Sequence, residues 1–455
     1  MRRRSTSDIN GTPISDTHDE VEKLRQRVAD LDSRLVSERL AKKAAIHEMR
    51  LLTASIPWRA VALYRQFMRL VPLSLLRGPA FRPDRLTGKH GVGSKGDSSR
   101  DLGRDRYKIA IITDCDYWAF ANTARQVKRV LANEVDVHII NFPDFDNELQ
   151  FLLALEGYDL VHFMPRWILL HLADSSPQKR DKAVRYSVDK SLQTLQRRTA
   201  VTTAVCEHAC SDKAGIAKYK KLFSSIDGYS VCSPKLQEIY SRIEACPPPA
   251  AILRDGVDLN FFVPHNLERF SDAETRPLVV GWAGNSLWQS KASGTDFKGL
   301  HTILRPALEM LARDGIEMVE NFADRHIMLR SYTDMPEYYR SIDVLVCASS
   351  IEGTPNPVLE AMACGVPIVS TDVGIVSETL GPLQSEFILR ERSVEAMAAT
   401  LRRLRNSRGL LPRLSSENLE SIRPCNWEVR AQAFLPLFRA AIERRRAAIN
   451  GASSF

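Results

Sequence analysis

Residues 349–378, SSIEGTPNPVLEAMACGVPIVSTDVGIVSE, contain the pattern on which the fold assignment depends. They begin at the end of the apolar run DVLVCA, which predicts a buried strand. We expect a helix to begin near Asn356, with Pro357 in its first turn. In open α/β sheets ligands collect where strands end, and the free N–H groups of a helix start favour an anion. Glu352 and Glu360 flank this helix start, so the two carboxylates can reach different parts of one ligand.

The surrounding chain predicts two successive parallel α/β units. Apolar runs such as YKIAIIT, VDVHII, DLVHFM and AVTTAV alternate with helical segments from residue 107 onward. The alternation stops near residues 262–277 and restarts with PLVVGWAG. We therefore predict one domain over 107–262, a second over 263–426, and a final helix over 427–446 that returns to the first domain. A chain of 455 residues has room for two such domains and additional segments.

The N-terminal quarter of the chain has a different character. We predict a disordered tail over 1–18, a coiled coil over 19–55, a basic amphipathic helix over 56–77 and a linker over 78–106. The coiled coil rests on spacings of three and four between its apolar residues, which are Val21, Leu24, Val28, Leu31 and Leu35. It either joins copies of the chain into a homo-oligomer or packs on its own protein, and the basic helix either lies on anionic lipid or packs likewise.

Charge and composition restrict the partners. The net charge is +8, and residues 56–106 alone hold 11 Lys and Arg against 4 Asp and Glu. A local basic stretch of this kind indicates an anionic surface rather than nucleic acid. No apolar run approaches the roughly 20 residues of a spanning helix, and no apolar stretch follows the first basic residues as in a secretory signal. We expect a cytoplasmic protein, peripheral at the inner membrane face, whose eight scattered cysteines stay reduced.

The 349–378 stretch resembles the signature of retaining GT-B glycosyltransferases of the glycosyl transferases group 1 family. The E-x7-E pattern of that family corresponds to Glu352 and Glu360, and the resemblance continues through LRSYTDMPEYYRSIDVLVCASSIEG and LRDGVDLNFFVP, over residues 107–446. It implies two Rossmann-like domains facing across a cleft, an acceptor domain followed by a donor domain. It also implies metal-independent transfer from a nucleotide-sugar to a glycan or lipid-linked acceptor, as in bacterial O-antigen or capsule synthesis.

The resemblance gives roles to residues of the second domain. Glu360 would bind the ribose, Glu352 the donor sugar as part of the catalytic centre, and Lys298 of DFKGLHTIL the diphosphate. A cation suits that place because the leaving diphosphate gains negative charge as the bond breaks. Further donor contacts would come from the loop and helix start, namely Gly353, Thr354 and Asn356.

One expected cation of the donor site is missing. Where the family has an arginine, this chain reads GWAGNSLWQ, with Asn285 near that place. Lys291 is the substitute that the sequence offers.

The acceptor side follows from the first domain. VTTAVCEHACSD resembles a strand-ending segment of the family, which places His208 near the reacting carbon as a catalytic residue. The segment DCDYWAFANTARQ supplies three acceptor-side candidates, Trp118, Phe120 and Asn122. Cys206, His208 and Cys210 are separated by single residues, which matches no usual zinc spacing, so we expect neither a metal nor another cofactor.

Two other functions stay open at this stage. A GT-B relative such as a sugar-nucleotide epimerase or a phosphorylase would share the donor site, and product analysis would separate it from a transferase. A non-catalytic scaffold that assembles a glycan-building complex through its coiled coil is the alternative of a different class. The missing arginine and the altered loop EGTPNPVLE keep that alternative open.

Overall fold

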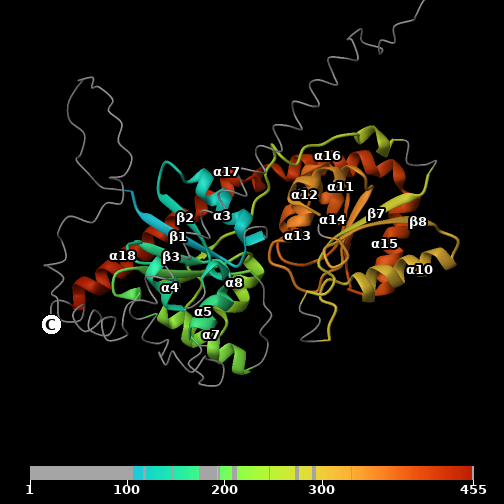
Figure 1. Cartoon of the computed structure of the whole chain (residues 1–455). Helices are drawn as coiled ribbons and strands as arrows, with labels where there is room; N and C mark the ends of the chain where they lie inside the picture. The colour runs from blue at the N-terminus through green and yellow to red at the C-terminus, as the bar shows by residue number, and fades with distance from the viewer. Residues whose placement is uncertain are drawn as a thin grey trace, which may run out of the picture. The chain divides into compact units, whose positions relative to one another are not determined.

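The computed structural model describes residues 106–115, 119–145, 148–173, 192, 195–206, 213–244, 246–271, 276–288, 294–328 and 330–452. They belong to one compact unit that begins at Gly103, drawn in colour in Figure 1. The predicted tail, coiled coil and basic helix of residues 1–77 lie outside the described residues, as does the predicted linker except for its last residue.

The first lobe is built around a parallel sheet. Within the described ranges its six strands lie in the order β2-β1-β3-β4-β5-β6. These strands are β1 (Lys108–Thr113), β2 (Asp136–Asn141), β3 (Leu160–Phe163), β4 (Ala200–Val205), β5 (Gly228–Val231) and β6 (Ala251–Ile252). The helices are α3 (Ala119–Val130), α4 (Glu148–Ala154), α5 (Arg166–Ala173), α7 (Lys213–Ser225) and α8 (Pro234–Ser241). Because β3 and β4 are buried along their whole length, they read as continuous apolar runs in the sequence.

The second lobe repeats this architecture with five parallel strands among the described residues, in the order β11-β10-β9-β7-β8. They are β7 (Leu278–Gly284), β8 (Met318–Asp324), β9 (Val344–Cys347), β10 (Ile368–Thr371) and β11 (Ile388–Leu389). The helices are α10 (Arg305–Arg313), α11 (Met335–Arg340), α12 (Asn356–Ala363), α13 (Val376–Thr379), α14 (Pro382–Ser385), α15 (Val394–Asn406) and α16 (Leu411–Ser421). Two parallel sheets with crossover helices confirm the predicted pair of Rossmann-like domains.

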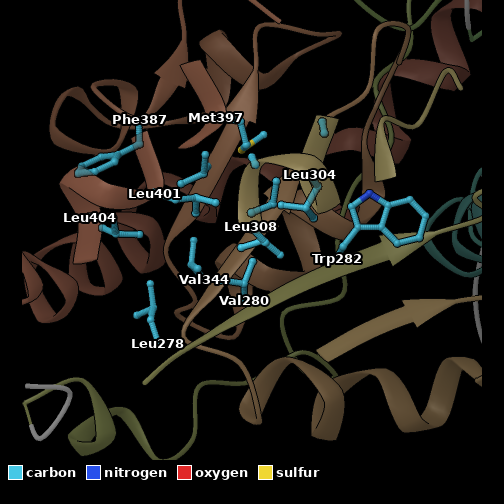
Figure 2. Close-up of a cluster of buried hydrophobic side chains, with 14 of the residues drawn as sticks. Leu278, Val280, Trp282, Leu304, Leu308, Val344, Phe387, Met397, Leu401 and Leu404 are labelled. Atoms are coloured by element: carbon cyan, nitrogen blue, oxygen red, sulfur yellow. The ribbon is translucent and has the colours of Figure 1, made fainter. Parts of the chain in front are cut away.

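Side-chain alternation along β7 explains how the second lobe holds its helices. Leu278, Val280 and Trp282 point to one face, where they pack with residues of α10 and α15 such as Leu308 and Leu401 (Figure 2). Val279 and Ala283 belong to the opposite face, which packs against α11 and α12. Both faces are therefore buried, and each helix layer is fixed by residues two apart on one strand.

The C-terminal segment packs on the first lobe. Helices α17 (Trp427–Arg430) and α18 (Phe434–Ala452) pack against one face of the first sheet. Trp427, Phe434 and Phe438 are at most 2% exposed and share a hydrophobic cluster with Ile109 and Ile111 of β1. None of the helices described here combines the length and the apolarity that crossing a bilayer requires.

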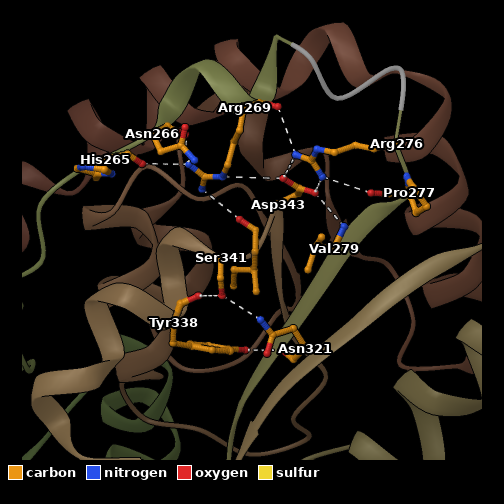
Figure 3. Close-up of polar contacts among 11 residues, drawn as sticks. His265, Asn266, Arg269, Arg276, Pro277, Val279, Asn321, Tyr338, Ser341 and Asp343 are labelled. Carbon is orange, nitrogen blue, oxygen red and sulfur yellow. Dashed lines mark hydrogen bonds and ion pairs between the residues drawn. The ribbon is translucent and has the colours of Figure 1, made fainter. Parts of the chain in front are cut away.

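A buried ionic cluster ties the connection between the lobes to the second sheet (Figure 3). Asp343, just before β9, accepts hydrogen bonds from both terminal nitrogens of Arg276, at 2.5 and 2.7 Å, and from the backbone N–H of Val279 at 2.8 Å. Arg269 reaches the same carboxylate at 3.9 Å and donates to the carbonyl of Ile342 at 3.1 Å. The cluster lies where β7 and β9 begin, so it anchors the segment before β7 at the end of the sheet opposite the predicted site.

Candidate active site

The loop after β9 brings two predicted residues together. Glu352 Oε1 accepts a hydrogen bond from Lys298 Nζ at 2.5 Å and from Ser349 Oγ at 2.7 Å. The two charged side chains are only 16% and 20% exposed, so water screens their attraction weakly. The Lys298 ammonium also lies 5.1 Å from the ring centre of Trp288, a cation–π distance. Lys298 and Glu352 therefore form one charged group at the carboxyl end of the second sheet.

The position of Lys298 follows from its neighbours. Asp296 caps the turn that follows, because its carboxylate accepts the N–H groups of Gly299 at 2.8 Å and His301 at 2.9 Å. Gly299 has φ +70, and a Cβ there would collide with the backbone of Ala348 at the end of β9. Glycine thus lets the Lys298 segment lie directly against the strand that leads to Glu352.

Glu360 lies inside α12 and has different partners from Glu352. Its Oε2 accepts a hydrogen bond from the hydroxyl of Tyr339 at 2.6 Å, while Oε1 has no partner among the described residues. Tyr339 is fully buried in α11. Burial raises the pKa of Glu360 to about 7, and the Tyr339 hydrogen bond acts in the opposite direction. One carboxylate oxygen is thus held by the protein, and the other can accept a ligand hydroxyl.

Gly353 is fixed by close approach of two other segments. A Cβ at this position would collide with the carbonyl oxygen of Cys206 and with the Cys232 sulfur, both from the first lobe. Gly374, with φ +53, packs in turn against the carbonyl of Gly353. Only a residue without a side chain fits between them. The Glu352 loop therefore touches the end of β4, which is the point where the predicted segment with His208 begins.

The start of α12 is tied to a carboxylate that the sequence reasoning missed. Asn356 Nδ2 lies 3.5 Å from Asp255 Oδ2, and the Asp255 N–H lies 3.4 Å from Thr354 Oγ1. Thr123 of α3 donates to Asp255 Oδ1 at 3.0 Å. Burial raises the pKa of Asp255 to about 6, while hydrogen bonds from Thr123 and Asn356 lower it. The segment LRDGVDLNFFVP pointed to a connection between domains, but nothing in it signalled this contact with α12.

Asn285 lies in the turn after β7. Its Oδ1 accepts the N–H of Leu287 at 3.1 Å, so the side chain caps its own turn. The adjacent strand β8 is in register with β7 through Gly284 and Asp324, and the Arg325 N–H donates to the Gly284 carbonyl at 2.9 Å. Asn285 is thus a turn residue with an arginine on the neighbouring chain segment.

The acceptor-side predictions are only partly described. Phe120 is half-buried against the hydrophobic cluster under α18. Burial raises the pKa of Tyr332, and a hydrogen bond with the side chain of Asn122 of α3 acts in the opposite direction. Trp118, His208 and Lys291 lie outside the described residues. In the described part of the chain no group of three His, Cys, Asp or Glu side chains has the arrangement of a metal site.

His162 on β3 is a core residue. Its side chain is fully buried, and Nδ1 lies 2.9 Å from Thr202 Oγ1. Burial lowers the pKa of His162 to about 3, so the imidazole is neutral, and the rings of Phe434 and Phe438 lie beside it. This histidine belongs to the packing between the first sheet and α18.

A family model and several known proteins match parts of the chain. Residues 304–407 match the model of the family described as Glycosyl transferases group 1. Over 113 residues the chain is 35% identical to the lipopolysaccharide core biosynthesis mannosyltransferase LpsB of Rhizobium meliloti, covering 24% of this chain and 30% of that protein. It is 23% identical over 366 residues to the putative colanic acid biosynthesis glycosyltransferase WcaL of Salmonella typhimurium, covering 62% and 88%.

Solved structures agree with the two-lobed fold. Sucrose-phosphate synthase of Thermosynechococcus elongatus aligns with a TM-score of 0.54 at 16% identity, covering 73% of this chain and 98% of that one. Anabaena Alr3699/HepE, solved with UDP and glucose, aligns with a TM-score of 0.52 at 12% identity, covering 73% and 100%. At 16% and 12% sequence identity, these two matches show similarity of fold alone.

The two lobes and the loop before α12 define a protein of the GT-B fold. This chain matches the glycosyl transferases group 1 model over residues 304–407, which include the Glu352 loop and α12. It spans 30% of the length of LpsB and 22% of that of the putative teichuronic acid biosynthesis glycosyltransferase TuaC of Bacillus subtilis, which is 31% identical over 86 residues.

Proposed function

We propose that this protein is a glycosyltransferase that moves a sugar from a nucleotide-sugar donor to a glycan or lipid-linked acceptor, with retention at the anomeric carbon. The observation that carries the proposal is the Lys298–Glu352 pair at 2.5 Å, in the loop that leads into α12. A cation, a carboxylate and a helix start occur together there, and these are the groups that a sugar diphosphate needs. Glu360, four residues into α12, adds a carboxylate oxygen that is open to a ribose hydroxyl.

The transfer itself uses these groups as follows. The bond between the anomeric carbon and the diphosphate oxygen breaks, and its electron pair leaves with the diphosphate. Lys298 and the N–H groups at the start of α12 stabilise the negative charge that develops. The acceptor hydroxyl oxygen forms the new bond to the same carbon, and its proton passes to the leaving phosphate. We propose His208 as the catalytic residue of the acceptor side, on the resemblance of VTTAVCEHACSD to a strand-ending segment of the family.

The proposed acceptors come from the relatives. LpsB, TuaC and WcaL bear names from lipopolysaccharide core, teichuronic acid and colanic acid biosynthesis. The Anabaena structure holds UDP and glucose, which supports a nucleoside diphosphate sugar as donor class.

We propose a role in bacterial cell-surface polysaccharide synthesis, with the basic residues 56–77 on the inner membrane surface. Liposome flotation of the chain with and without residues 1–100 tests the membrane part, and equal binding by both forms contradicts it.

Turnover with a panel of nucleotide-sugars tests the activity. We expect nucleotide release and a glycosidic product with one donor, unchanged by EDTA, and loss of both in Glu360→Ala. The control is Glu309→Ala, which removes an exposed carboxylate from α10. An epimerised donor formed without acceptor would instead indicate an epimerase. Unchanged turnover in Glu360→Ala would contradict the proposed site.

A further inference from the structure

The hydroxyl of Ser349 is bonded to the carboxylate that is proposed to contact the donor sugar. Ser349 Oγ donates to Glu352 Oε1 at 2.7 Å, and this hydroxyl has no other hydrogen-bond partner among the described residues. Ser349 is only 3% exposed, so water competes weakly for the bond. Hydrogen bonds to ionised carboxylates are among the strong ones in proteins. The bond therefore fixes one oxygen of Glu352.

Both polar contacts of Glu352 within the described chain fall on the same oxygen. Lys298 Nζ and Ser349 Oγ reach Oε1 at 2.5 and 2.7 Å, whereas no hydrogen bond from a described residue reaches Oε2. Two donors on Oε1 restrict rotation of the carboxylate about its last bond. Oε2 is then held in one direction, in which it can accept a sugar hydroxyl.

The two donors on Oε1 respond differently to a bound nucleotide-sugar. Lys298 is also the proposed partner of the diphosphate, so a bound donor divides the attraction of the ammonium between two anions. The Ser349 hydroxyl is neutral and has no comparable attraction to the diphosphate. Ser349 therefore keeps Glu352 in place while Lys298 interacts with the leaving group.

The backbone of the Ser349 segment is itself fixed by two other parts of the second lobe. Thr371 Oγ1, at the end of β10, donates to the Ser349 carbonyl at 2.6 Å, and Thr371 is 4% exposed. The N–H of Ser350 donates to the carbonyl of Phe297 at 2.8 Å. The hydroxyl of Ser349 is thus held in position by packed neighbours, as a preorganised site requires.

We propose that Ser349, supported by Thr371, is a positioning residue that orients Glu352 toward a hydroxyl of the donor sugar. This inference rests on the proposed function. It gives Ser349 a part in recognition of the transferred sugar and none in recognition of the nucleotide. Removal of the hydroxyl should therefore leave binding of a bare nucleoside diphosphate unchanged, because that ligand lacks the transferred sugar.

Calorimetric titration of the full-length chain with UDP, GDP and ADP, and with UDP-glucose, GDP-mannose and ADP-glucose, tests this role. The quantity compared is the ratio of the affinity for the preferred nucleotide-sugar to the affinity for its nucleoside diphosphate. We expect Ser349→Ala to lower this ratio about 10-fold, with nucleoside diphosphate binding as in the wild type. The matched control is Ser350→Ala, which removes an exposed hydroxyl from the same loop and should leave the ratio unchanged.

A double-mutant cycle tests whether Ser349 acts through Glu352. In a Glu352→Ala background, Ser349→Ala should cause no further fall in the ratio. Thr371→Val should lower the ratio in the otherwise wild-type chain, whereas Thr371→Ser should keep it, because serine retains the hydroxyl that bonds to the Ser349 carbonyl. Should Ser349→Ala lose its fold by circular dichroism, this pair of Thr371 variants decides.

The outcomes separate the two proposals. If the wild type binds none of the six ligands, the proposed function fails and this inference fails with it. If it binds a nucleotide-sugar, and Ser349→Ala has the same ratio as Ser350→Ala, the role of Ser349 is overturned while the donor site stands. Equal weakening of nucleotide-sugar and nucleoside diphosphate binding in Ser349→Ala would overturn it as well, because it would indicate a general disruption of the loop.

Discussion

Glu360 is a residue whose charge depends on the protein around it. Its ordinary pKa of 4.5 rises to about 7 because the carboxylate is buried beside Tyr339. The folded state then binds a proton between pH 4.5 and 7 that the unfolded state has released. Its contribution to stability is therefore fully present below pH 4.5 and is lost as the pH rises through 7.

Glu360→Gln should remove this pH dependence. The amide keeps the shape of the side chain and can still accept the Tyr339 hydrogen bond. Between pH 5 and pH 7.5 we expect the free energy of unfolding of the wild type to fall by about 1–2 kcal/mol relative to that of the variant. Urea unfolding at both pH values measures the difference. A constant difference in free energy of unfolding across this range would show that Glu360 titrates as an exposed carboxylate.

Gly353 gives a second prediction at the residue scale. A methyl group there would meet Cys206 and Cys232, so Gly353→Ala should destabilise the protein by about 1–3 kcal/mol. Gly409→Ala is the control, since a Cβ at Gly409 meets nothing within 4 Å. Thermal unfolding of both variants compares them. Equal melting temperatures would mean that the Glu352 loop does not pack against the end of β4.

At the scale of elements, the ionic cluster around Asp343 holds the start of the second sheet. Asp343→Ala would leave Arg276, Arg269 and the N–H of Val279 without their shared acceptor. Removing one partner of a buried ion pair costs about 3–5 kcal/mol. Asp314→Ala, at an exposed pair with Arg402, should cost less than about 1 kcal/mol. Denaturant unfolding distinguishes the two, and similar losses would contradict a special role for the buried cluster.

Helices and strands could be predicted from the sequence where a pattern of neighbouring residues specifies them. The apolar runs of β3, β4 and β9 are buried along their whole length, and the helix near Asn356 begins at that residue. Lys298 and Glu352 were predicted separately as donor-site residues, and the structure joins them in an ion pair that the sequence did not predict. Asp255 was missed because its importance comes from contacts with Thr123 and Asn356, each more than 100 residues away in the sequence. Such contacts leave no pattern in the sequence around Asp255.

At the scale of the whole molecule, the C-terminal helices complete the first lobe. Phe438 is fully buried with Ile109 and Ile111 of β1, although more than 300 residues separate them. We expect Phe438→Ala to cost about 3–5 kcal/mol, because it opens a cavity in this cluster. Val429→Ala removes a side chain that is 56% exposed, so it should change stability by less than about 0.5 kcal/mol. Equal stability of the two variants would show that α18 is not part of the first lobe.

The resemblance to the family could be recognised from the sequence, whereas the acceptor could not be predicted from it. The glycosyl transferases group 1 signature lies in one continuous stretch, whereas an acceptor site is assembled from loops of the first lobe. Of the candidates for that site, Trp118, Phe120 and Asn122 follow β1 in the sequence, whereas His208 follows β4. Pocket shape, which sequence periodicity does not encode, decides which sugar and which acceptor fit.

Hydrogen exchange of the full-length chain with and without its nucleotide-sugar tests the central claim most directly. A donor held at the start of α12 should slow amide exchange in residues 349–363 and in the Lys298 segment, since ligand binding suppresses local opening. Protection confined to other parts of the chain, with these two segments unchanged, would contradict the account.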